Sequence, residues 1–231
     1  MNREWSELNK SMQTQLRRES TFSEGIQTLL MLRRSLAETL QDMKRGLRRE
    51  DFHTMPFPNA AGYHSKTIAY SIWHIFRIED IVAHDLICRD EEVISLFRDA
   101  IGVPIITTGN ELSGPQITDF SKRLDLDALY KYAAAVKEGT DTLLGQLTYR
   151  DLRRTFDEAD KERIRSLQVV SSDERSRWLI DYWCGKDVRG LIQMPFSRHW
   201  IMHVEACLRI KKKLKKSIKD GMAEKKTAQH F

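Results

Sequence analysis

Apolar residues recur at three- and four-residue steps along four long stretches of the chain, the spacing of one buried face of an α-helix. The first stretch predicts a helix over 21–46, opened by the Thr-x-x-Glu spacing of a capping box at Thr21. Two others predict helices over 65–88 and 125–147. A last helix is expected to begin near Pro195, a residue suited to a first helical turn, and to continue into a lysine-rich tail.

The segments between these stretches are expected to be connections. Residues 51–64 contain two prolines and predict a linker, and residues 103–120 carry Gly109, Gly114 and Pro115 and predict a long loop. Residues 148–195 predict a polar segment, either a helical excursion or a hairpin, followed by a short helix begun by a capping box at Ser171. The pattern therefore predicts an all-α protein, a four-helix bundle with insertions between the long helices.

Length and composition support one folded domain. The chain has 231 residues, of which 41% are hydrophobic, enough for one large core. Only 5 prolines and 11 glycines interrupt it, which favours long helices. We expect an N-terminal extension over 1–20, a bundle domain over 21–220, and a basic, disordered tail over 221–231.

The net charge of +5 comes mainly from the C-terminal run "RIKKKLKKSIKDGMAEKK". Lysines occupy almost every face of that run, and few aromatic residues are present to stack on bases. A solvated helix end, where cations also favour the helix dipole, explains the run better than a nucleic-acid or membrane partner. Association with nucleic acid through this tail is the weaker alternative.

Cysteine usage and hydropathy bear on the compartment. The three cysteines, Cys88, Cys184 and Cys207, form no CxxC pair, which argues against a disulfide framework and against a thiolate zinc site. The N-terminus lacks the apolar core of a signal peptide, and no stretch approaches the length of a membrane span. These features predict a cytoplasmic protein.

Three histidines carry the candidate chemistry. His199 and His203 lie four apart, on the face of the last predicted helix that should point inward. His74 occupies the equivalent apolar stripe of the 65–88 helix. Imidazoles from two helices would form an open three-His site that suits zinc, nickel, iron or copper. The alternative is that they are core histidines with ordinary hydrogen-bond partners.

The segment "SIWHIFRIEDIVAH", followed far downstream by "SRHWIMHVEACLRIKK", resembles the DinB-like superfamily, which includes YfiT-type proteins. In that family one histidine lies on the second bundle helix and an H-x-x-x-H pair on the last, and the matching positions are His74, His199 and His203. The resemblance implies a four-helix bundle over 22–217, a divalent metal, zinc or nickel, and a homodimer. It also implies a small-molecule substrate, with activity as a thiol S-transferase using a low-molecular-weight thiol, or as a hydrolase.

The mechanism predicted for such a site is a water or thiol whose pKa is lowered by the metal and which then acts as the nucleophile. Tyr70 and Asp85 are weak candidates for a catalytic or orienting role, because both lie near the His74 face. Arg77 is expected at a helix edge, and Glu79 and Asp80 are expected on the surface. The alternative function is a non-catalytic helical bundle that binds a small ligand or a protein partner without metal chemistry.

Overall fold

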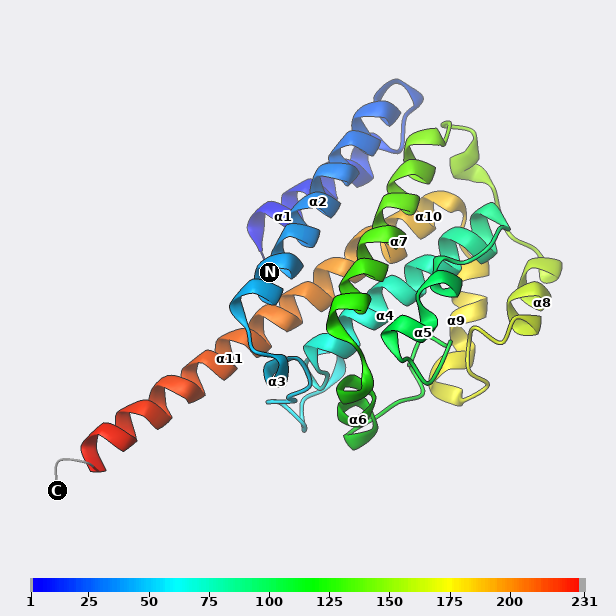
Figure 1. Cartoon of the computed structure of the whole chain (residues 1–231). Coiled ribbons are helices and arrows are strands. Elements are labelled where there is room, and N and C mark those ends of the chain that lie inside the picture. Colours follow the sequence, from blue (N-terminus) through cyan, green and yellow to red (C-terminus); the bar gives the residue numbers. More distant parts are fainter. Residues whose placement is uncertain (1, 229–231) are drawn as a thin grey trace.

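A computed structural model describes the backbone of residues 2–228 and the side chains of residues 2–217. Within that part the chain forms helices, turns and loops and no strand, so the all-α prediction is confirmed (Figure 1). The longer elements, in chain order, are α1 (Arg3–Gln15), α2 (Phe22–Gly46), α4 (Ile68–Asp80), α6 (Pro115–Arg123), α7 (Leu126–Gln146), α8 (Glu158–Ser166), α9 (Glu174–Cys184) and α11 (His199–Ala228).

The four predicted long helices are present and pack together. Helix α4 contacts both α7 and α11, and α2 contacts the same two helices. All 13 residues of α4 are buried, so this helix runs through the centre of the molecule. It continues without a break as the π-helix η3 (Ile81–Cys88). A second π-helical segment, η6 (Met194–Arg198), leads into α11 where the sequence predicted a start at Pro195.

Both predicted capping boxes are wrong. The Thr21 hydroxyl does not cap α2; it donates to the carbonyl of Gln15 at 2.7 Å. Helix α9 is capped by Asp173, whose carboxylate accepts from the backbone N–H of Arg175 at 2.9 Å, and not by Ser171. The spacing of a capping box alone therefore does not fix which residue caps a helix.

The predicted connections contain more helix than expected. The loop over 103–120 ends at Gly114, because Pro115 occupies the first turn of α6. The linker over 51–64 carries the short helices α3 (Arg49–Phe52) and η2 (Gly62–His64) at its ends. The excursion over 148–195 is built from α8, α9 and α10 (Val188–Gln193). Of these short helices, α8 and α9 lie to one side of the long ones (Figure 1).

The two ends of the chain differ. Residues expected to be an extension form α1, which packs on α2, buries Trp5 and Met12, and donates from Trp5 Nε1 to Ser35 Oγ at 2.9 Å. At the other end α11 extends beyond the body (Figure 1). Disorder of the tail over 221–231 stays a prediction, because side chains from 218 onward and residues 229–231 lie outside the described part. No helix among the described residues is long and apolar enough to cross a membrane.

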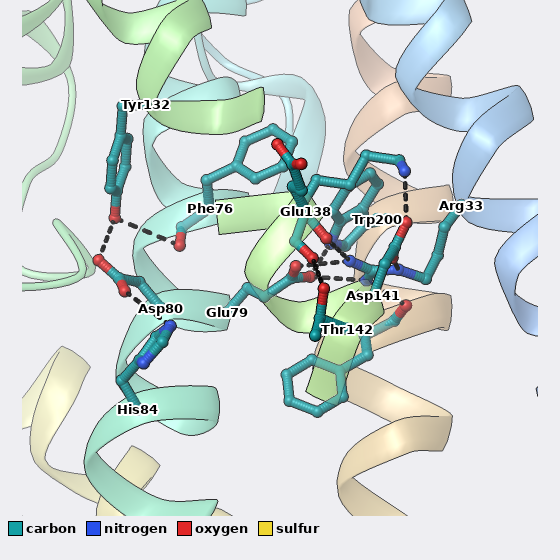
Figure 2. Close-up of polar contacts among 12 residues, drawn as sticks. Arg33, Phe76, Glu79, Asp80, His84, Tyr132, Glu138, Asp141, Thr142 and Trp200 are labelled. Carbon is teal, nitrogen blue, oxygen red and sulfur yellow. Dashed lines mark hydrogen bonds and ion pairs between the residues drawn. The ribbon is translucent and has the colours of Figure 1, made fainter. Parts of the chain in front are cut away.

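A buried ionic cluster joins the four long helices, and we call it the Arg33 cluster. Arg33 of α2 donates to both carboxylate oxygens of Glu79 at 2.9 and 2.7 Å and to Asp141 at 2.6 Å (Figure 2). Trp200 Nε1 donates to Glu79 at 2.7 Å. Burial alone would lower the pKa of Arg33, but Glu79 and Asp141 hold it above its ordinary value. The surface position predicted for Glu79 is therefore wrong.

Asp80 and Arg77 are also buried, which corrects the positions predicted for them. The Asp80 carboxylate accepts from two backbone amides of η4 (Val93–Leu96) at 2.9 Å and from the Tyr132 hydroxyl at 2.8 Å. The Arg77 guanidinium forms an ion pair with Glu92 at 2.6 Å. The helical period did not identify these positions as inward because every face of α4 is covered by another element.

Candidate metal centre

The structure brings the three predicted histidines together in the interior, and we call them the histidine triad. The ring centroids of His74 and His199 are 5.1 Å apart, those of His74 and His203 are 4.9 Å apart, and those of His199 and His203 are 4.6 Å apart. Only 6%, 6% and 2% of these residues' surfaces are exposed, in that order. One nitrogen from each ring lies within 4.8 Å of the others.

The register between α4 and α11 positions the triad. His74 lies in the middle of α4, and His199 and His203 occupy the first two turns of α11. Trp200 directly follows His199 on α11, and Glu79 lies five positions after His74 on α4. The hydrogen bond from Trp200 to Glu79 therefore links the two helices close to the triad. A slip of either helix by one turn would break this buried charge-assisted bond, so the Arg33 cluster holds the triad in place.

A backbone carbonyl fixes the orientation of His74. The ring Nδ1 of His74 lies 2.7 Å from the carbonyl oxygen of Thr108, in the loop that precedes α6. A carbonyl only accepts, so Nδ1 carries the proton and Nε2 is left with a free lone pair. Metal-binding histidines are commonly held in this way by a partner on the other ring nitrogen.

Three other imidazole nitrogens of the triad lack hydrogen-bond partners among the described residues. Nδ1 of His199 and both ring nitrogens of His203 are buried and make no hydrogen bond with any described residue. Burial lowers the pKa of all three histidines, that of His74 to about 4, so the rings are neutral at pH 7. Buried polar groups without partners are uncommon in folded proteins, and neutral imidazole is the form that binds metals.

The donor set fits one divalent ion. Zn–N bonds are about 2.0–2.1 Å long, so ring nitrogens up to 4.8 Å apart must move somewhat closer together for one ion to bind all three. Among the described residues no carboxylate or thiolate joins the three nitrogens. Three neutral ligands leave the full charge of the ion uncompensated and leave coordination positions open. Imidazole alone does not select among zinc, nickel, iron and copper.

Tyr70 packs against the triad, but its hydroxyl does not donate a hydrogen bond to any of the three histidines. Its ring stacks on His74 with centroids 5.5 Å apart and an interplanar angle of 11°. Its hydroxyl donates instead to the Gly109 carbonyl at 2.9 Å, and burial raises its pKa. We therefore assign Tyr70 to packing and to holding the loop that carries Thr108.

Asp85 lies too far along the helix to reach the triad. It follows His74 by eleven positions, which separates the two by roughly 16 Å along the axis. Burial, together with the nearby Glu92 carboxyl, raises the pKa of Asp85 to about 8. Its Oδ2 is buried with no hydrogen-bond partner. The carboxyl is thus a neutral group of the core rather than an orienting partner of the histidines.

Cys207 follows His203 by one helical turn and is fully buried. Its sulfur does not belong to the group of close ligand atoms. Burial raises the pKa of the Cys207 thiol to about 12, so it remains protonated at neutral pH. The environment supports the interpretation of Cys207 as a small apolar core residue.

A cavity of about 230 Å³ opens beside the triad. His74 and His199 line it, together with Tyr63 and Asn110. Sequence reasoning missed Tyr63 because it lies in the expected linker, where no periodicity reveals an inward side chain. Its ring meets the edge of His203 with centroids 4.7 Å apart. The rest of the wall comes mainly from the excursion over 148–195, which had no assigned role.

No protein-family model matches this chain, and no curated protein matches it either. The case for a function therefore depends on the site itself.

Proposed function

We propose that the protein is a metal-dependent enzyme of the DinB-like type, a thiol S-transferase or a hydrolase acting on a small molecule. In this proposal α2, α4, α7 and α11 are the four-helix bundle of that family, and α8, α9 and α10 are an insertion beside the site. The observation that supports it most is the buried triad of neutral imidazoles, three of whose nitrogens have no partner among the described residues.

The residues of this chain would bind the ion and shape its surroundings. His74, His199 and His203 supply three nitrogens, and the Thr108 carbonyl keeps His74 in the tautomer that presents Nε2. A divalent ion bound there lowers the pKa of a coordinated water or thiol towards neutrality. The cavity beside His74 and His199 gives a substrate access to the open side of the site.

The attacking group comes from outside the chain. Cys207 is the nearest thiol in sequence, but it is buried, protonated and outside the triad. In the hydrolase reaction the oxygen of water bonds to an acyl carbon, and the leaving group departs with a proton. In the transferase reaction the sulfur of a small thiol bonds to a substrate carbon, the leaving group departs from that carbon, and the thiol proton goes to solvent.

The metal content of untagged, full-length protein tests this proposal by elemental mass spectrometry. We expect close to one divalent ion per chain, and we expect His199→Ala and His203→Ala each to lose it. His53→Ala is the matched control, since His53 is half-buried and lies outside the triad. Metal-loaded protein should then turn over aryl esters or thiol–electrophile pairs.

Two results would reject the proposal. A protein that takes up no zinc, nickel, iron or copper would leave the histidines as core residues and favour the non-catalytic alternative. A metal that remains at full occupancy in both His199→Ala and His203→Ala would place the ion somewhere else.

A further inference from the structure

The cavity beside the triad has an aromatic wall. Trp178, Tyr182 and Trp183 of α9 all line it. The rings of Trp178 and Tyr182 meet edge to face, with centroids 5.5 Å apart. Flat aromatic rings favour other aromatic rings at such distances, in stacked or edge-to-face arrangements. The wall is therefore suited to a planar partner.

Trp178 is held in place although it is exposed. It shows 49% of its surface, an unusual exposure for so large an apolar side chain. Its indole N–H nevertheless donates to the Arg175 carbonyl at 2.9 Å, which fixes the ring at the mouth of the cavity. A rigid, exposed aromatic ring beside a cavity is typical of a binding site, because little side-chain freedom is lost when a ligand covers it.

The end of the cavity beside the triad offers hydrogen-bond donors. The Tyr63 hydroxyl lines the cavity and makes no hydrogen bond with a described residue, so its O–H is available as a donor. Asn110 accepts from the Thr108 hydroxyl through Oδ1 at 2.9 Å, and its NH₂ group has no partner among the described residues. Both groups would bind a ligand that carries a hydrogen-bond acceptor.

We propose that this cavity binds a planar aromatic molecule of one or two rings that carries a carbonyl or a similar acceptor. The rings lie against Trp178, Tyr182 and Trp183, and the acceptor faces Tyr63 and Asn110. Cavities of about 150 Å³ hold one benzene ring, so the volume of about 230 Å³ leaves room for a second ring or a polar group. The inference rests on the proposed function in one respect only: the hydrogen-bond acceptor of the bound molecule would be the part of the substrate that reacts at the metal.

A pair of matched probes tests the inference by calorimetry on full-length protein. 2-Naphthamide is planar, and its fully saturated counterpart carries the same amide on puckered rings. We expect the planar probe to bind about tenfold more tightly, because only it stacks on the wall. Trp178→Ala should weaken its binding about two- to tenfold. Met31→Ala is the control, since Met31 is 52% exposed and does not line the cavity.

Both probes are titrated before and after removal of metal with a chelator, which separates this inference from the proposed function. Binding of the planar probe to protein that holds no metal, weakened by Trp178→Ala, supports the aromatic cavity even where the metal proposal fails. Equal affinity for the two probes overturns the inference, and so does binding that Trp178→Ala leaves unchanged. A stoichiometric metal without any binding of the planar probe overturns the inference alone.

Discussion

Two buried polar clusters share helices α4 and α11 but satisfy their polar atoms in opposite ways. In the Arg33 cluster the guanidinium has two carboxylate partners, and Glu79 also accepts from Trp200 (Figure 2). In the histidine triad, on neighbouring positions of α4 and α11, His199 and His203 bury ring nitrogens that make no hydrogen bond with a described residue. The first cluster is complete within the chain, whereas the second leaves three ring nitrogens without a hydrogen-bond partner among the described residues.

This difference separates stability from function. A buried polar group without a partner costs about 1–3 kcal/mol, and apolar side chains of similar size would avoid that cost. The Arg33 cluster holds the helices in register, so removing one of its members should weaken the fold. The triad's unpartnered nitrogens are expected to destabilise the metal-free fold. Replacing one of these histidines with an apolar residue should therefore not lower its stability. The predictions below test that contrast in order of expected size.

The largest effect is expected from breaking the complete cluster. Glu79→Ala leaves Arg33 buried with only one carboxylate and removes the acceptor of Trp200. We expect a loss of about 3–5 kcal/mol in the free energy of unfolding, measured by urea titration. Glu79→Gln keeps the shape and one acceptor, so its loss should be smaller. A loss below about 1 kcal/mol for Glu79→Ala would show that the cluster does not hold the helices.

The opposite sign is expected in the triad. His203→Leu removes two buried nitrogens that have no partner. In metal-free protein we expect the free energy of unfolding to rise by about 1–2 kcal/mol, while metal binding is lost. His53→Leu, outside the triad, should do neither. If His203→Leu destabilised the metal-free protein, the imidazole would have a structural partner and the contrast would fail.

Asp85 provides a pH-dependent comparison, since its Oδ2 is also buried without a partner. Burial raises its pKa to about 8, against about 3.9 in an unfolded chain. Between these values the folded chain keeps a proton that the unfolded chain has released, so its contribution to stability falls as pH rises.

Asp85→Asn should flatten this slope and exceed the wild-type stability near pH 8 by at least about 1 kcal/mol. Urea titrations near pH 5 and near pH 8 measure the difference. An unchanged slope in Asp85→Asn would mean that Asp85 is ionised in the folded protein.

The smallest effect is expected at Tyr70. Tyr70→Phe keeps the ring on His74 and removes the hydrogen bond to the Gly109 carbonyl. We expect a loss of about 1 kcal/mol in thermal or urea unfolding, with one metal still bound per chain. Loss of the metal in this variant would show that the hydroxyl acts on the triad and not on the loop.

The sequence was sufficient for the long helices and for the triad because both depend on local periodicity. Apolar residues at three- and four-residue steps predicted α2, α4, α7 and α11, and histidines in those apolar stripes predicted which imidazoles point inward. Pro115 also carried a signal for α6, since proline in a first helical turn is common, but the surrounding glycines favoured a loop.

The remaining features depend on contacts between distant parts of the chain. Glu79 was expected at the surface, and its partner Arg33 lies 46 positions earlier in the sequence. Tyr63 faces the triad from a segment without periodicity, and Trp178 lines the cavity from the excursion over 148–195. Such placements follow from how helices pack, and the pattern of one segment does not contain that information.

X-ray absorption spectroscopy at the metal edge tests the central claim most directly, because it reports the atoms bound to the ion in full-length protein loaded with zinc. We expect about three imidazole nitrogens at about 2.0–2.1 Å, lighter-atom scattering for the open positions, and no sulfur. The imidazole signal should disappear in His203→Ala and persist in His53→Ala. A spectrum with sulfur ligands, or one that His203→Ala leaves unchanged, would show that the triad is not a metal site.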